Sequence, residues 1–180
     1  MNDSEQLLQN CLSAKDYKGA INKIADVYHK PLYWHIRKIV KNHDDANDVL
    51  QNTYIKIFKG LPSFQQRSSV KNWAYRIAYN ESINFINREQ KKKYESISEM
   101  NGEDYFSKLK ADVYFDTSTL ESRLHTVLRG LSEKKRQIFN MKYFDELKFE
   151  EIAKITGWNT NSIKTAFYAT KQKIERQLIA

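Results

Sequence analysis

The amino-acid sequence predicts an all-α protein with two small helical domains joined by a linker, the C-terminal domain being a helix-turn-helix. Only five glycines and two prolines occur in 180 residues, and the alternating pattern typical of β-strands is absent. Apolar residues instead recur at three- and four-residue spacing, as in helices that bury one face. The net charge of +8 is concentrated in residues 1–93 and 131–180, whereas acidic residues outnumber basic ones between them. Such a distribution is typical of a chain that touches a polyanion at two places, but charge alone slightly favours a solvated, lysine-rich surface.

The first predicted elements are two helices at about residues 17–28 and 32–41. Pro31 lies between them and marks a break, because proline has no backbone N–H to donate within a helix. We expect this pair to pack on the apolar stripe of the helix that follows.

The clearest periodicity predicts a helix over residues 45–59. Asp44 or Asp45 can cap its start, and Gly60 with Pro62 ends it. Seven residues at helical spacing form one continuous apolar stripe, which we expect to be buried: Ala46, Val49, Leu50, Thr53, Tyr54, Ile57 and Phe58.

The opposite face of this helix is polar except for one isoleucine. It presents Asp48, Gln51, Asn52, Ile55 and Lys59. A partner-binding surface and an ordinary solvated face both fit this pattern, since single exposed isoleucines are common on protein surfaces.

A polar loop with a possible serine cap leads into a long helix over residues 70–93, which closes in the basic run "REQKKK". Its predicted inner face comprises Val70, Ala74, Ile77, Ala78, Phe85 and Ile86. One outer side carries amides and cations, namely Arg76, Asn80, Asn84, Asn87, Arg88 and Lys91, with Trp73, Tyr75 and Tyr79 nearby. Aromatic rings and hydrogen-bond donors suit single-stranded bases, but the same rings can equally be core residues beside solvated amides.

The segment 94–116 combines weak periodicity with a negative balance, and we interpret it as a linker between domains 1–93 and 117–180. In the second domain, the last two helices flank Gly157, where a helix-turn-helix requires a left-handed residue. Trp158 is expected to plug the turn. The predicted inner residues are Ile152, Ala153, Ile155, Ile163, Phe167 and Ile174. The predicted outward set, suited to base edges and phosphates, is Asn159, Thr160, Asn161, Ser162, Lys164, Thr165, Tyr168 and Lys171.

Catalytic and metal-binding signatures are absent from the sequence. It contains no glycine-rich phosphate loop, no paired-histidine metal motif and no local nucleophile signature, so we expect neither an enzyme nor a cofactor. The single Cys11 excludes an internal disulfide. We therefore expect a cytoplasmic protein without a signal peptide or membrane insertion.

Three segments in this order resemble the extracytoplasmic-function sigma factors of bacterial RNA polymerase. They are "DDANDVLQNTYIKIFKGLPSF", "SSVKNWAYRIAYNESINFINR" and "LSEKKRQIFNMKYFDELKFEEIAKITGWNTNSIKT". The resemblance covers about residues 20–93 and 118–178. It implies a factor that binds core polymerase, recognises two promoter elements and helps to open the DNA.

The resemblance assigns roles to three groups of residues. Core polymerase would bind Asp48, Gln51, Asn52, Ile55 and Lys59. The downstream promoter element would be opened, and its unstacked base captured, by Arg67, Ser68, Ser69, Lys71, Asn72, Trp73, Arg76, Tyr79, Asn80, Asn84 and Arg88. The upstream duplex would be read by the outward set from Asn159 to Lys171, with Lys164 at the family's usual lysine position.

The resemblance also implies partners. These are core RNA polymerase and promoter DNA, both duplex and melted, together with an anti-sigma protein, which in this family is frequently membrane-bound. Ala166 and Ala169 stand where the family commonly has arginines. A sigma factor tethered to polymerase needs few cations of its own, because each DNA reader acts at high effective concentration. The alternative is an autonomous helix-turn-helix regulator of duplex DNA, which would need neither the face around Asp48 nor the amide-rich helix.

Overall fold

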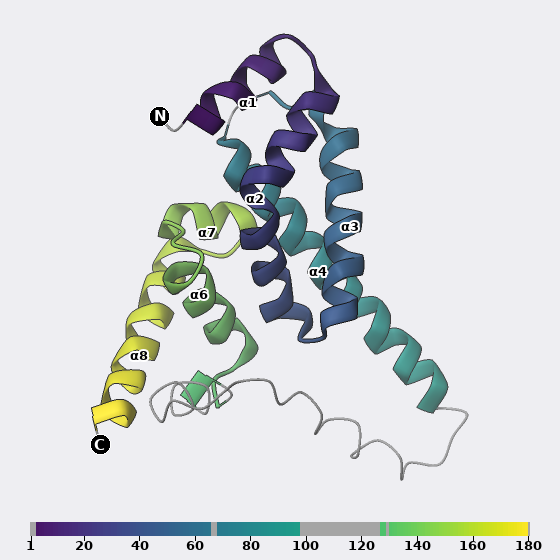
Figure 1. The fold of residues 1–180 in the computed structure, drawn as a ribbon. Coiled ribbons are helices and arrows are strands. Elements are labelled where there is room, and N and C mark those ends of the chain that lie inside the picture. Colours follow the sequence, from purple (N-terminus) through teal and green to yellow (C-terminus); the bar gives the residue numbers. More distant parts are fainter. Residues whose placement is uncertain (1–2, 66–67, 98–126, 129, 180) are drawn as a thin grey trace. The chain divides into compact units, whose positions relative to one another are not determined.

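The structure, a computed structural model, describes residues 3–65, 68–97, 127–128 and 130–179. Every regular element in these ranges is a helix, which confirms the predicted all-α class (Figure 1). The chain divides into two compact units, and the N-terminal helices α1–α4 and C-terminal helices α6–α8 are described separately.

Helix α1, Asp3–Ser13, was not predicted from the sequence and packs on α2, Tyr17–Val40. Asp16 caps α2, because its side chain accepts a hydrogen bond of 2.9 Å from the backbone N–H of Gly19. At the other end Lys41 adopts a left-handed conformation with φ of 69° and stops the helix.

The predicted break at Pro31 is wrong, since α2 continues through it. Pro31 is exposed, and one face of α2 is buried on both sides of it: Ala20, Ile24, Tyr28, Leu32, His35, Ile36 and Ile39. Burying one large apolar side chain contributes roughly 1.5–3 kcal/mol, whereas a proline inside a helix costs ~3 kcal/mol. The combined free energy from burying these side chains therefore exceeds the cost of the proline.

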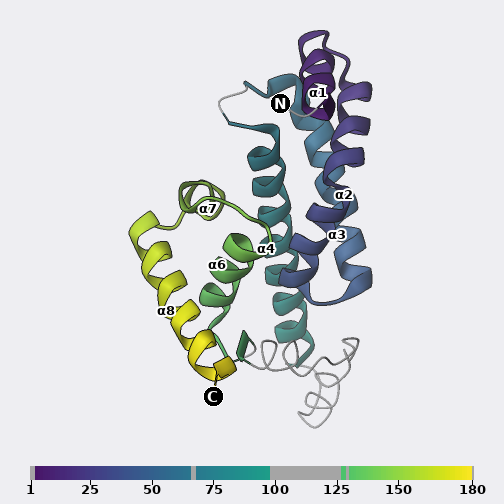
Figure 2. The same cartoon turned by 60° about the vertical axis from the view of Figure 1, so that its left-hand side comes forward.

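Helix α3, His43–Gly60, lies beside α2 and runs in the opposite direction (Figures 1 and 2). Its start is capped by Asn42, whose side chain accepts from the N–H of Asp44 at 3.0 Å, so the predicted aspartate cap is wrong. Asp44 and Asp45 instead lie in the first turn, where the helix dipole favours negative charge. Five predicted residues are buried: Ala46, Val49, Leu50, Thr53 and Ile57.

Two members of the predicted apolar stripe of α3 are not fully buried. Tyr54 is half-buried, and burial raises its pKa to about 12. Phe58 is 40% exposed, so the prediction that it belongs to the core is wrong. The short 3₁₀-helix η1, Leu61–Ser63, follows and contains Pro62.

Helix α4, Val70–Ile97, begins as predicted at a serine, because the Ser69 hydroxyl accepts from the N–H of Asn72 at 3.2 Å. It continues past the predicted end at residue 93, and the remainder of the predicted linker, 98–116, lies outside the described residues. Val70, Ala74 and Ala78 are buried as predicted, whereas Ile77, Phe85 and Ile86 are only half-buried. Tyr75 and Tyr79 complete this part of the core.

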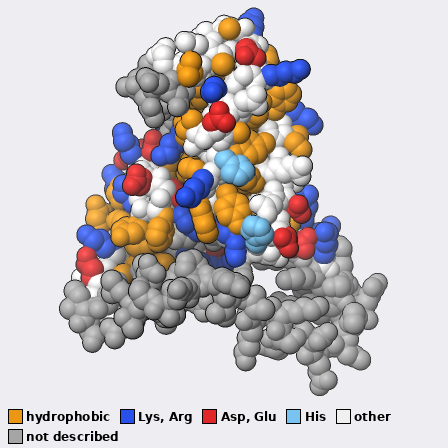
Figure 3. Space-filling view, viewed as in Figure 1, with side chains coloured by type: hydrophobic (Ala, Val, Ile, Leu, Met, Phe, Trp, Pro, Cys, Tyr) orange, Lys and Arg blue, Asp and Glu red, His pale blue; other side chains and the backbone are white. Residues whose placement is uncertain are grey.

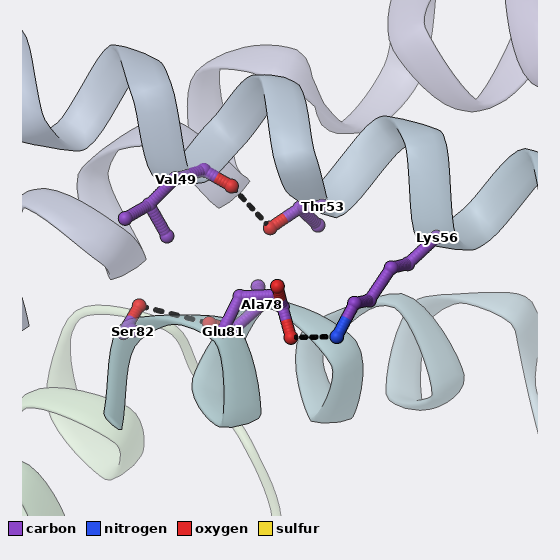
Figure 4. A network of polar contacts seen from close by, with 6 residues as sticks. All are labelled: Val49, Thr53, Lys56, Ala78, Glu81 and Ser82. Carbon is purple, nitrogen blue, oxygen red and sulfur yellow. Dashed lines mark hydrogen bonds and ion pairs between the residues drawn. The ribbon is translucent and has the colours of Figure 1, made fainter. Parts of the chain in front are cut away.

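The facing sides of α3 and α4 carry polar groups whose hydrogen bonds are satisfied (Figure 4). The buried Thr53 and Ser82 hydroxyls donate to carbonyls of their own helices, at 2.7 Å to Val49 and 2.8 Å to Ala78. Lys56 reaches across to Glu81 and makes an ion pair that joins the two helices. Buried polar groups are tolerated here because each has a partner.

The C-terminal helices are α6, Glu133–Tyr143, α7, Phe149–Thr156, and α8, Thr160–Ile179, with α6 packed on α8. Their predicted inner residues Ile152, Ile155, Ile163, Phe167 and Ile174 are buried, and Ala153 is half-buried. Gly157 has a φ of +75° between α7 and α8. This confirms the left-handed turn that the sequence predicts for a helix-turn-helix.

Candidate nucleic-acid interface

The outer face of α3 is exposed as the sequence predicts. Asp48, Gln51, Asn52, Ile55 and Lys59 are all exposed, with Ile55 at 46%. Phe58 lies at the margin of the same face, between Ile55 and Lys59 along the chain, and adds a second exposed apolar side chain. This face therefore offers an apolar centre inside a polar rim, the arrangement typical of protein–protein interfaces.

The exposed stripe of α4 carries the amides and cations. Arg76, Asn80, Asn84, Asn87 and Arg88 are exposed and, within the described part of the chain, have no hydrogen bond or ion pair. Asparagine amides can pair with base edges and arginines with phosphates. The stripe thus presents unused donors and acceptors along one side of a rigid helix.

The aromatic residues of α4 lie mostly away from that stripe. Tyr75 and Tyr79 are buried, Tyr79 being only 8% exposed. The expectation that Tyr79 contacts DNA is therefore corrected: its ring belongs to the core. Trp73 is half-buried, and its ring stacks on Phe64 at 4.6 Å between ring centroids.

The loop that precedes α4 is described at both ends. Ser69 is exposed and Ser68 is half-buried, as are Lys71 and Asn72 in the first turn of α4. The ammonium group of Lys71 lies 5.8 Å from the centroid of the Tyr75 ring. Arg67, which the sequence places in the same group, lies outside the described residues.

The outward set on α8 is largely confirmed as exposed. Asn161, Ser162, Thr165, Tyr168 and Lys171 are exposed, together with Asn159 just before the helix, whereas Thr160 and Lys164 are half-buried. Asn159 also has a structural role, because its side-chain oxygen accepts from the N–H groups of Asn161 at 2.9 Å and Ser162 at 3.2 Å. It is the N-cap of α8, which leaves its NH₂ group as the donor available to a ligand.

Lys164 is held by groups at the start of α7. Its ammonium group lies 3.4 Å from Glu150 Oε1 and 5.8 Å from the centroid of the Phe149 ring. A hydrogen bond from its own backbone N–H and, to a smaller extent, the contacts with Lys164 hold the pKa of Glu150 below its usual value. The carboxylate therefore remains charged near neutrality and pairs with the Lys164 ammonium group.

Aromatic side chains form a cluster on the C-terminal helices that sequence reasoning missed. Phe149 and Phe167 are in ring contact at 5.5 Å, and Tyr168 contacts both. Tyr143 and Phe144 at the end of α6 are exposed. Hydrophobic side chains gather over these helices in Figure 3. These aromatic residues come from three helices and the turn after α6, so the apolar periodicity of one helix does not predict the cluster.

Other kinds of site are not found in the described ranges. Within residues 3–65, 68–97 and 130–179, His, Cys, Asp and Glu form no group of three or more that could hold a metal ion. None of the described helices is long and apolar enough to cross a membrane.

Comparison with known protein families gives two matches, one in each half of the chain. Sigma-70 region 2 matches residues 24–92, and Sigma-70 region 4 matches residues 121–174. Among curated relatives, the RNA polymerase sigma factor SigV of Bacillus subtilis is 33% identical over 177 residues, which covers 97% of this chain and 93% of SigV. The ECF RNA polymerase sigma factor SigW of the same organism is 26% identical, with 91% of each chain covered.

Two solved structures share the fold. The sigma factor RpoE of Bartonella quintana, in complex with the anti-sigma factor NepR, superposes with a TM-score of 0.67 at 19% identity and covers 88% of this chain and 96% of its own. CnrH, solved in complex with the cytosolic domain of CnrY, superposes with a TM-score of 0.66 at 15% identity. The match covers 98% of this chain and 97% of the CnrH chain. Since the two family matches together span more than half of the chain in the predicted order, the chain belongs to the sigma-70 family and is an RNA polymerase sigma factor of the extracytoplasmic-function type.

Proposed function

We propose that three exposed surfaces divide the work of this sigma factor. The outer face of α3, from Asp48 to Lys59, binds core RNA polymerase. The start of α4 and its stripe from Arg76 to Arg88 hold the melted strand of the downstream element. The start of α8 reads the upstream element as duplex DNA.

One observation carries this proposal: the N-terminal helices expose two separate faces of different chemistry. The α3 face has two exposed apolar side chains, Ile55 at its centre and Phe58 at its margin, whereas the α4 stripe has only amides and cations at its exposed positions. A regulator that binds duplex DNA through one helix-turn-helix requires neither face. A factor that must hold both a protein and a single strand requires both.

The other parts of the proposal follow from the same division. Residues 1–93 and 117–180 act as separate domains, with 94–116 as the connection between them. The protein acts in the cytoplasm, where it supplies contacts rather than catalysis. The sigma factor RpoE of Bartonella quintana was solved in complex with the anti-sigma factor NepR, and we propose an anti-sigma protein as a partner here as well.

Transcription with purified core polymerase and a promoter library tests the proposal as a whole. New start sites that depend on this protein and share two spaced elements support it. An absence of such sites, together with tight binding of the protein alone to duplex DNA, favours an autonomous regulator instead.

A double variant tests the polymerase-binding face. Asp48→Arg with Ile55→Glu reverses a charge and places another in the apolar centre, so pull-down of core polymerase is lost while the helical circular dichroism is retained. The matched control is Asp26→Arg with Leu7→Glu, which makes the same chemical changes at exposed positions of α2 and α1. Equal pull-down by the two double variants rejects the assignment of the face.

A single variant tests the strand-holding stripe. Asn80→Ala removes an exposed amide and is expected to lower promoter opening more than binding to the closed promoter. Permanganate reactivity of thymines in the opened segment measures this. Reactivity equal to that of the parent protein counts against the assignment.

A further inference from the structure

We propose that Trp73 is a positioning residue for promoter opening: its indole packs on Gly60 at the end of α3 and on Phe64, and so fixes the start of α4. Capture of the base is then left to the polar groups that follow. This inference rests on the proposed function, because it explains how the strand-holding stripe is aligned with the polymerase-binding face.

The contact between Phe64 and Trp73 brings together two residues on opposite sides of the loop before α4. Their rings are stacked with centroids 4.6 Å apart and planes inclined by 30°. Backbone hydrogen bonds hold each residue locally, from the N–H of Phe64 to the carbonyl of Leu61 at 3.2 Å and from the N–H of Trp73 to that of Ser69 at 3.1 Å. One face of the indole is thereby occupied by protein.

Gly60 provides the second contact, and it does so by lacking a side chain. A Cβ atom at this position would lie 2.8 Å from Cζ2 and 3.4 Å from Cη2 of Trp73, whereas van der Waals contacts between carbon atoms are optimal at about 3.5–4.0 Å. The φ of Gly60 is −87°, which any residue adopts readily. Glycine is therefore required here for the close approach of the ring and not for the backbone conformation.

The position of these contacts gives them a role in alignment. Lys59, the last residue of the polymerase-binding face, immediately precedes Gly60, and Arg76, the first of the exposed stripe, lies three residues after Trp73. The indole thus ties the end of one functional surface to the start of the other. A ring displaced from Gly60 alters how α4 leaves the loop, although both surfaces keep their own residues.

The alternative role for Trp73 is direct stacking on an unpaired base. The two roles make opposite demands on the ring. Stacking on a base tolerates replacement by another aromatic residue, whereas the contact with Gly60 requires the Cζ2 and Cη2 atoms, which belong to the larger ring of indole and which phenylalanine lacks.

The experiment measures promoter opening by holoenzymes that carry Gly60→Ala, Trp73→Phe or both changes. Gly60→Ala alone is expected to lower the equilibrium constant for opening a duplex promoter about tenfold, which corresponds to about 1.4 kcal/mol, with unchanged affinity for core polymerase. On a promoter whose downstream element is already unpaired, the same variant is expected to match the parent protein within about twofold. A defect merely in folding would reduce activity on both templates and would lower core binding.

The double variant provides the decisive outcome. Because phenylalanine lacks the two atoms that the new methyl group would meet, Gly60→Ala with Trp73→Phe is expected to open the duplex promoter better than Gly60→Ala alone. Additive losses in the double variant overturn the inference, as does full opening by Gly60→Ala.

Comparison of Asn80→Ala with Gly60→Ala distinguishes a failure of this inference from a failure of the proposed function. If Asn80→Ala lowers opening but Gly60→Ala does not, the positioning role of Trp73 is rejected and the strand-holding stripe stands. If Asn80→Ala has no effect on either template, the proposed role of the stripe is itself rejected.

Discussion

Lys56 Nζ on α3 lies 2.5 Å from Glu81 Oε1 on α4. The two partners differ in exposure, since 55% of the Lys56 side chain but only 10% of the Glu81 side chain is accessible. The pair therefore places a nearly buried carboxylate at the helix interface and neutralises it with a cation that approaches from the surface. It joins α4 to the helix that carries the proposed polymerase-binding face.

Removal of the cation is expected to destabilise the protein. Lys56→Met leaves the Glu81 carboxylate without its partner and lowers the free energy of unfolding by about 1–2 kcal/mol, less than for a fully buried pair because solvent reaches Lys56. The control is Lys23→Met, which breaks an exposed pair with Asp26 and changes stability by less than ~0.5 kcal/mol. Equal losses in urea unfolding would contradict this account of the interface.

Phe58 is expected to matter for binding more than for folding. Its side chain is 40% exposed at the margin of the proposed polymerase-binding face, so Phe58→Ala is expected to lower the affinity for core polymerase about tenfold, as for a residue worth about 1.4 kcal/mol. Leu7→Ala removes a similarly exposed apolar side chain from α1 and serves as the control. Fluorescence anisotropy with labelled sigma factor measures both; the same affinity for the two variants would exclude Phe58 from the face.

Glu150 is expected to restrain DNA binding. Glu150→Gln removes the carboxylate 3.4 Å from Lys164, and the affinity of holoenzyme for the upstream element rises by about two- to fivefold at low salt, the range of an exposed ion pair. The gain shrinks as salt is added. Glu146→Gln removes one negative charge from the same domain at another exposed position, and an equal gain from it would show that only net charge matters.

The contact between Glu150 and Lys164 is expected to persist under mildly acidic conditions. Because the pKa of Glu150 is lowered in the folded protein, its favourable contribution is present above the ordinary pKa of glutamate and is lost only as the pH falls through the lower folded value. Mild acidification that leaves most glutamates charged therefore does not release Lys164. A difference between parent and Glu150→Gln that vanishes in this mild range would refute the assignment.

Tyr54 is expected to make stability depend on pH in the alkaline range. Burial raises its pKa from 10.0 to about 12, so the unfolded state releases the phenolic proton first. The contribution of Tyr54 is thus present below pH 10 and is lost as the pH rises towards 12. Denaturation of Tyr54→Phe is expected to be less sensitive to pH in that window than denaturation of the parent, whereas Tyr143→Phe, at an exposed position, leaves the dependence unchanged.

Gly157 is expected to be sensitive to the shape of a replacement and not to its volume. The position has φ of +75°, and no atom lies within 4 Å of a Cβ built there. Gly157→Val costs about 1–2 kcal/mol because a left-handed conformation strains a branched residue, and Gly157→Asn costs less because asparagine tolerates that region. Thermal unfolding measures both, and equal losses would point to a steric clash instead.

Residue spacing alone predicts the features of this fold that depend on local periodicity. The presence of α3, the exposed stripe of α4 and the turn at Gly157 follow from spacings of three and four residues and from the one residue type that favours positive φ. The order of the three quoted segments also indicates the family. Such signals need no knowledge of what packs against each helix.

Packing between helices determines whether side chains at the edges of their buried faces are exposed or covered. Phe58 and Tyr79 lie near the boundary between the inner and outer faces of their helices, where a neighbouring helix determines whether a ring is covered; one is exposed and the other buried. Continuous burial along α2 overrides the local cost of Pro31. The contact of Trp73 with Gly60 joins residues separated by a loop. In each case the deciding free energy comes from burial against residues distant in the chain, which helical spacing alone does not contain.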